Sequence, residues 1–112
     1  MRGLAGCFAV ALLCPQPVSA APRWTFCVAS SKGGADVWIS DVFQAERDRV
    51  ELENAFRAAV VKLGAANPDA QCPLPVEDKT EAVNAQFKAE EFNRSLGATL
   101  HAAPASEFPP RR

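Results

Sequence analysis

Four cysteines and a single histidine carry the most recognisable chemistry in this 112-residue chain. The cysteines are Cys7, Cys14, Cys27 and Cys72, and no two of them form a Cys-x-x-Cys motif. No residue beside Cys27 or Cys72 is of a type that activates a thiolate, which disfavours a redox or nucleophilic thiol. The alternative is a structural disulfide, and the choice between the two depends on the compartment in which the chain folds.

His101 is the only histidine, so a zinc site or a Ser-His-Asp or Cys-His arrangement would have to use this one imidazole. It stands in a short segment near the C-terminus, and no serine has a nucleophile-elbow motif around it. Asp36 and Asp41 flank a predicted strand and could share one rim, as the paired acids of a glycosidase do, but a domain of this size offers little room for a cleft. We predict no catalytic residue, no metal site and no cofactor.

Trp24 and Trp38 are the candidate binding residues. They lie near each other across a predicted hairpin, and by strand alternation they need not both face the core. An exposed tryptophan is a good anchor for a protein or glycan partner. The competing interpretation is that both fill a small core.

Residues 1–20 have the pattern of a secretory signal peptide. Met1-Arg2 is positively charged, 3–13 is small and apolar, and Val18-Ser19-Ala20 is a small-residue cleavage site. The apolar run is about half of the ~20 residues that span a bilayer, so we expect cleavage and no stable membrane span. Leu4-Ala5-Gly6-Cys7 is similar to a lipobox, and a lipid on Cys7 would instead tether the protein to a membrane.

Cleavage leaves Cys27 and Cys72 as the only cysteines, and export lets such a pair oxidise. We therefore predict a Cys27–Cys72 disulfide, which would close a loop of 45 residues (72 minus 27) and stabilise the fold by about 4 kcal/mol on the chain-entropy model. Without Arg2, the chain has 11 basic residues (12 minus 1) against 13 acidic ones. That balance argues against a nucleic-acid partner, which needs a basic face.

The elements that must position these residues form an α+β domain over 21–102. An N-terminal hairpin pairs strands at 23–29 and 36–42 around Gly33-Gly34. Two helices follow, at about 45–63 and 78–96, and we expect them to pack on a small antiparallel sheet. A short edge strand at 70–72 and a last strand at 98–102 are possible additions, and 103–112 is predicted to be a flexible Pro-rich tail.

The first helix has an apolar stripe at helical spacing, which consists of Leu52, Phe56, Ala59, Val60 and Leu63. The second begins at an Asp78 N-cap with Glu81 three residues on, and ends at Gly97. Its Phe87 and Phe92 point about 140° apart, so one is exposed or the helix is covered on two sides. Both hairpin strands are also apolar on two sides, which suggests that both sheet faces are partly covered.

The layout resembles small exported bacterial proteins of no assigned function that carry two cysteines. The matching motifs are Cys27-Val28-Ala29, Ser40-Asp41-Val42-Phe43, Leu52-Glu53-Asn54-Ala55-Phe56 and Gln71-Cys72. Val28 stands where such proteins have an aromatic residue. The resemblance implies a secreted or periplasmic location in the bacterial envelope and two matched cysteines, and it implies no activity.

The sequence thus favours an exported, non-catalytic binding protein whose partner is an unidentified protein or a cell-envelope glycan. One alternative is a peptidoglycan- or glycan-binding module. The other is a small hydrolase or thiol enzyme, which would depend on His101 or a free cysteine.

Overall fold

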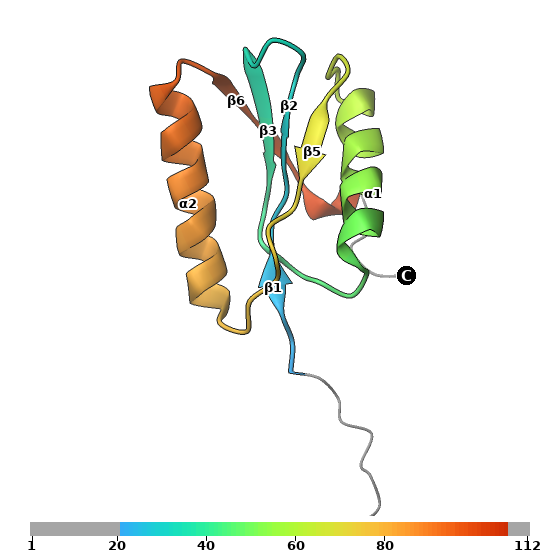
Figure 1. Cartoon of the computed structure of the whole chain (residues 1–112), viewed down its shortest axis with the longest axis vertical. Helices are drawn as coiled ribbons and strands as arrows, with labels where there is room; N and C mark the ends of the chain where they lie inside the picture. The colour runs from blue at the N-terminus through green and yellow to red at the C-terminus, as the bar shows by residue number, and fades with distance from the viewer. Residues whose placement is uncertain (1–20, 108–112) are drawn as a thin grey trace, which may run out of the picture.

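A glycine-containing turn closes the β-hairpin that the sequence predicts. The computed structural model describes residues 21–107, in which β2 (Val28–Ser30) pairs antiparallel with β3 (Asp36–Ser40). Gly33 and Gly34 have φ angles of 92° and 78° in the turn between them, a region that glycine enters without steric cost. The hairpin forms the centre of the molecule (Figure 1).

The first predicted strand, 23–29, is in fact two strands, β1 (Trp24–Thr25) and β2. The second predicted strand, 36–42, ends early with β3 at Ser40. Beyond it, β4 (Phe43–Gln44) pairs with β1 in a separate two-stranded sheet. At the break between β1 and β2, the Ser40 hydroxyl accepts a hydrogen bond from Cys27 N (2.8 Å). A side chain thus takes the place of a backbone carbonyl, and the regular ladder stops there.

Helix α1 (Arg49–Lys62) begins four residues later than predicted. Its N-cap is Asp48, whose Oδ1 accepts a hydrogen bond from Glu51 N (3.0 Å). Four residues of the predicted stripe are buried, namely Leu52, Phe56, Ala59 and Val60. Leu63 is 41% exposed because it is the C-cap and lies beyond the last full turn.

Helix α2 (Lys79–Ser95) begins and ends where the sequence predicts. Asp78 caps it by accepting a hydrogen bond from Thr80 N (2.9 Å), one residue before the predicted partner Glu81. Gly97, with φ 86°, follows the C-cap and turns the chain into β6 (Thr99–Ala103).

The four-stranded sheet has the order β5-β2-β3-β6 and is mixed instead of antiparallel. β5 (Asp69–Gln71) joins one edge antiparallel to β2, so the possible edge strand forms. The possible last strand also forms, as β6, which pairs with the hairpin but runs parallel to β3 at the opposite edge.

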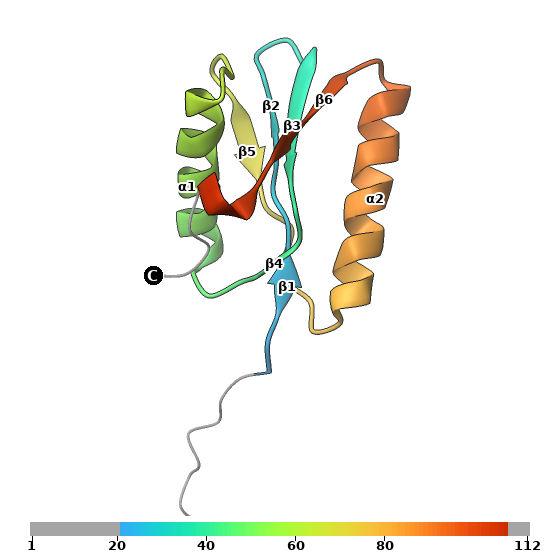
Figure 2. The ribbon, with the colours of Figure 1, turned by 180° about the vertical axis from the view of Figure 1, so that it is seen from behind.

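The two helices cover opposite faces of the sheet, as Figures 1 and 2 show. Side chains alternate along β3, so Trp38 points to the α1 face while Val37 and Ile39 point to the α2 face. The core on the α1 face consists of Cys27, Ala29, Trp38, Phe43, Leu52, Phe56, Ala59, Val60, Ala65, Ala70, Cys72 and Ala103. The core on the α2 face consists of Phe26, Val37 and Ile39, with half-buried neighbours such as Ala89 and Leu100.

The fold continues beyond residue 102, where the tail was predicted to begin. Ala103 is buried, and Ala105–Glu107 form the short helix η1, in which Ala105 N donates a hydrogen bond to Asp41 Oδ1 (2.8 Å). The remaining tail, 108–112, lies outside the described residues, as do the predicted signal peptide at 1–20 and Cys7 and Cys14 within it. In the described range, neither helix combines the length and the apolar character that crossing a membrane requires.

Candidate functional site

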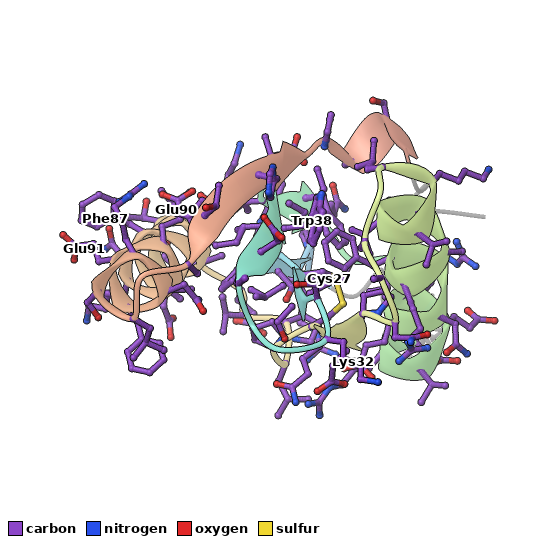
Figure 3. All side chains as sticks on the ribbon, turned by 90° about the horizontal axis from the view of Figure 1, so that it is seen from above. Cys27, Lys32, Trp38, Phe87, Glu90 and Glu91 are labelled. Atoms are coloured by element: carbon purple, nitrogen blue, oxygen red, sulfur yellow. A yellow bond between two sulfur atoms is a disulfide. The ribbon has the colours of Figure 1, made fainter. Side chains whose placement is uncertain are left out.

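The predicted disulfide is present between Cys27 and Cys72. Both cysteines are almost completely buried between the sheet and α1, where Figure 3 shows the yellow sulfur–sulfur bond. The first turns of α1 hold the backbone of Cys72 from both sides. Arg49 Nε donates to its carbonyl oxygen (2.9 Å), and Glu53 Oε2 accepts from its amide nitrogen (3.0 Å). The two thiols that a thiol enzyme would need are therefore consumed in a structural cross-link.

His101 holds two strands together. Its Nε2 lies 2.9 Å from Asp36 Oδ1, and its ring stacks on Trp38 with centroids 4.7 Å apart. Asp36 begins β3 and His101 is the middle residue of β6, so these contacts fix the edge strand on the α1 face. The side chain of His101 is 40% exposed.

Trp24 and Trp38 do not form a shared contact surface. Trp24 pairs with Gln44 and Trp38 with Ala29, so the two are not cross-strand neighbours. Trp38 is 6% exposed and belongs to the core. Trp24 is half-buried, and the Lys79 Nζ lies over its ring, 4.8 Å from the centroid.

The acidic residues give no paired site. Asp36 and Asp41 stand at opposite ends of β3, and each is occupied by its own hydrogen bond, to His101 and to Ala105. The shared rim that we considered is therefore wrong. Within residues 21–107, no group of three or more histidines, cysteines or carboxylates is arranged to hold a metal ion.

Helix α2 exposes large apolar side chains on two flanks. Ala82 is the only residue of this fully described helix that is buried. Val83 and Phe87 (42% and 55% exposed) lie on one flank, and Phe92 and Leu96 (62% and 68%) on the other. Both phenylalanines are thus exposed, whereas the sequence suggested one exposed ring or a helix covered twice. Figure 3 shows Phe87 and Glu91 projecting away from the sheet.

A groove follows the flank of α2 that faces β5. Three hollows of about 100, 310 and 250 Å³ share residues and form one trough, which we call the β5-side groove. Its floor is Phe26 and Val28. Its walls are α2 and the segment 69–74, in which Leu74 is 70% exposed. The hollows of about 100 and 310 Å³ have a mostly apolar lining that includes Trp24, Pro73, Val76, Ala82, Ala85 and Ala89. The hollow of about 250 Å³ is polar, since Ser30, Asp69, Gln71 and Asn93 line it.

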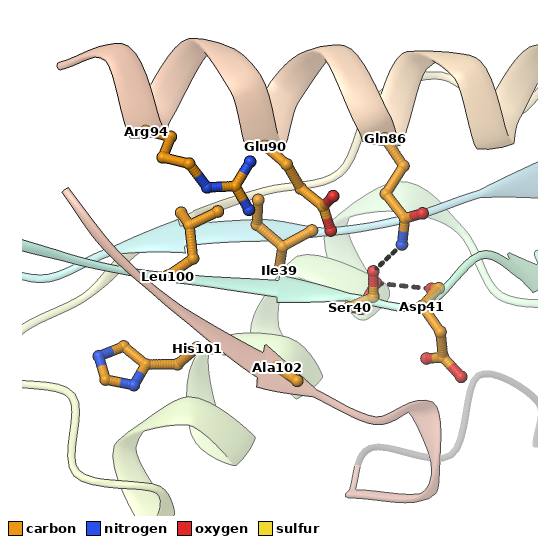
Figure 4. A pocket seen from close by; sticks show the side chains of 9 residues that line it. All are labelled: Ile39, Ser40, Asp41, Gln86, Glu90, Arg94, Leu100, His101 and Ala102. Atoms are coloured by element: carbon orange, nitrogen blue, oxygen red, sulfur yellow. Dashed lines mark hydrogen bonds between the residues drawn. The ribbon is translucent and has the colours of Figure 1, made fainter. Parts of the chain in front are cut away.

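A second hollow of about 350 Å³, the β6-side groove, lies between α2 and the strands β3 and β6 (Figure 4). Its lining includes the polar side chains of Gln86, Glu90, Arg94 and Asp41. Gln86 Nε2 donates to the backbone oxygen of Ser40 (2.6 Å). His101 also lines this hollow, but its ring points away from α2 (Figure 4).

The sequence reasoning missed the β5-side groove. Leu74 stands between Pro73 and Pro75, and a large apolar residue fixed between two prolines in a connection is a signal that could have been noticed. The alanines at 82, 85 and 89 are a second signal, because small residues leave room beside a helix. Comparisons with protein-family models, with characterised proteins and with solved structures found no match, so the resemblance to small exported bacterial proteins stays a prediction.

Proposed function

We propose that this chain is an exported, non-catalytic binding protein that holds a protein partner in the β5-side groove. The observation that carries the proposal is the concentration of exposed apolar side chains around this groove, namely Leu74, Phe92 and Leu96. Soluble monomeric proteins rarely expose large contiguous apolar patches, and such patches usually mark an interaction site. The disulfide supports a location outside the cytosol, in the periplasm or beyond the cell.

The groove suits a protein segment better than a small substrate. Each of its hollows is at or below the lower end of the about 300–1,000 Å³ that is usual for small-molecule sites. The hollows follow one another along α2, which fits an extended segment that places apolar side chains in the two apolar hollows and a polar side chain in the third. The histidine and both thiols are engaged in structural contacts, which weighs against the alternative of a hydrolase or thiol enzyme.

Site-specific photo-cross-linking in the exporting cell tests the proposal. A photoreactive residue at Phe92 should give one discrete protein adduct, and Leu74→Asp should abolish it by charging the groove. Val61 on α1 is the matched control position, since it is also exposed (51%) but lies on the other face. Absence of an adduct from position 92, or the same adducts from 61 and 92, contradicts the proposal.

A glycan partner is the second candidate, and the polar lining of the β6-side groove favours it. Guanidinium, amide and carboxylate groups at Arg94, Gln86 and Glu90 match the hydroxyl and amide groups of a cell-wall sugar. Sedimentation with purified sacculi distinguishes the two candidates. A protein that stays in the supernatant rules out the glycan, whereas binding that Arg94→Ala weakens and Leu74→Asp does not would favour it.

A further inference from the structure

The two edges of the sheet are protected very differently. β5 is three residues long and carries Asp69, and a proline adjoins each edge strand, Pro68 before β5 and Pro104 after β6. Short length, charge and proline are the usual means by which an edge strand avoids pairing with another chain. β6 is five residues long, and its sequence Thr-Leu-His-Ala-Ala contains neither proline nor a carboxylate, lysine or arginine. One edge is therefore blocked and the other is open.

The main-chain groups at the open edge can be assigned. Thr99 N donates to Ala35 O (2.9 Å), so the main-chain groups of Thr99 face β3. Alternate residues of a strand turn these groups to opposite sides, so the N–H and C=O groups of Leu100 and Ala102 point away from the sheet. β3 is the single strand neighbour of β6 in the described part of the chain. In Figure 2, β6 is the strand nearest the viewer, and no other ribbon of that part covers it.

We propose that two copies of this chain associate through β6, in antiparallel register about a two-fold axis at His101. The axis places Leu100 of one copy opposite Ala102 of the other. Because both residues turn their main-chain groups outward, each of the two Leu100–Ala102 pairs exchanges two hydrogen bonds. The four-stranded sheets of the two copies then join into one continuous sheet.

The side chains fit a second copy in particular. Leu100 is half-buried and Ala102 exposed, both on the α2 face, so the register sets a large side chain against a small one across the interface. In a two-fold dimer the same surface of both copies forms the interface, so that surface must be complementary to itself. A head-to-tail contact between different surfaces would instead add copies without limit and give fibres. β6 contributes no carboxylate, lysine or arginine that would repel its own copy. Its one titratable side chain, His101, lies on the axis and is held within its own chain by Asp36 and Trp38.

The charges beside β6 are also self-complementary. Glu90 and Arg94 line the β6-side groove on the same flank of α2, and neither is in an ion pair within the described chain. Figure 4 shows His101 level with the stretch of α2 between them. A two-fold rotation about His101 reverses the direction of α2, and so turns Glu90 of one copy toward Arg94 of the other. The β5-side groove lies on the opposite flank and stays open, so the pair of copies would offer two partner sites.

Analytical ultracentrifugation of the purified exported protein, from micromolar to millimolar concentration, tests the pairing. We expect reversible dimers. Ala102→Asp should raise the dimer dissociation constant about tenfold or more, because it places a short charged side chain against the partner's Leu100. Gln71→Asp at the blocked edge is the matched control and should leave the constant unchanged.

Amide hydrogen exchange of the unmodified protein provides a second measurement that needs no variant. The Leu100 and Ala102 amides should become protected as the concentration rises, while their neighbours that face β3 stay protected throughout. A monomer at every concentration overturns the proposal. So does a dimer that resists Ala102→Asp or whose concentration-dependent protection lies elsewhere. Neither result bears on cross-linking at Phe92, so this pairing and the proposed function fail separately.

Discussion

The two faces of the sheet are covered by helices of similar length, but the helices differ in how much buried core they form with the sheet. On the α1 face, twelve residues of the described chain form a continuous buried core that includes the disulfide. On the α2 face, the buried cluster consists of Val37 and Ile39 of β3 and Phe26 between β1 and β2, and the helix adds Ala82 as its one buried side chain. One layer therefore holds the domain together, while the other leaves large apolar side chains exposed.

The difference originates in the residues that each helix turns toward the sheet. α1 presents Leu52, Phe56 and Val60, all almost fully buried. α2 presents Ala82, Gln86, Ala89 and Asn93, at the same helical spacing. Small and polar side chains remove little apolar surface from water, so α2 gains little from its packing. Its phenylalanines lie on the flanks, where they stay exposed instead of joining the core.

Removing the same ring from each face gives the largest expected contrast. Phe56→Ala should lower the free energy of unfolding by about 3–5 kcal/mol, since Phe56 is completely buried and its loss leaves a cavity. Phe87→Ala should change it by about 0.5 kcal/mol or less. Urea unfolding followed by tryptophan fluorescence measures both. Equal losses from the two variants would show that α2 is as well packed as α1.

Removing the disulfide should cause the next largest loss in the free energy of unfolding. Replacing both Cys27 and Cys72 with alanine should cost about 2–4 kcal/mol, because the unfolded chain regains the freedom of the 45-residue loop. Urea unfolding of the double variant beside the wild-type protein measures the loss. Alkylation before and after denaturation is the control, and two reactive thiols in the wild-type protein would contradict the disulfide and the oxidising compartment together.

Local rules explain what the sequence predicted correctly. The turn at Gly33-Gly34, the Asp78 N-cap and the helix end before Gly97 each depend on a few neighbouring residues. The buried apolar residues of α1 were predictable because they recur at helical spacing. The disulfide was predictable because Cys27 and Cys72 are the two cysteines outside the predicted signal peptide.

Long-range pairing explains what the sequence did not predict. The break at Cys27 depends on the Ser40 hydroxyl, thirteen residues away, and the position of Trp38 depends on which face receives α1. The parallel direction of β6 is set by how α2 crosses the sheet, which no local pattern encodes. The β5-side groove escaped prediction for the same reason, because its walls come from segments that meet only in the folded chain.

Removing a hydrogen bond that α1 makes to the backbone of Cys72 should lower the free energy of unfolding by less. Glu53→Ala should cost about 1–2 kcal/mol, because it leaves the Cys72 amide without its acceptor and breaks the contact with Arg49 (3.5 Å). Glu91→Ala on the outer side of α2 is the matched control, and we expect it to be nearly neutral. Chemical denaturation of the two variants side by side decides the matter. A neutral Glu53→Ala would mean that water replaces the carboxylate without loss.

The smallest loss of stability is expected from removing the contacts that His101 of β6 makes with β3. His101→Ala should lower stability by about 1 kcal/mol, because it removes the hydrogen bond to Asp36 and the stacking on Trp38. His101→Phe keeps an aromatic ring on Trp38 and should recover part of the loss. Urea unfolding measures both variants, and the fluorescence of Trp38 should change more in the alanine variant. If His101→Ala instead removed a cellular function while the fold stayed intact, the imidazole would act chemically, and the enzyme alternative would replace the binding protein proposed above.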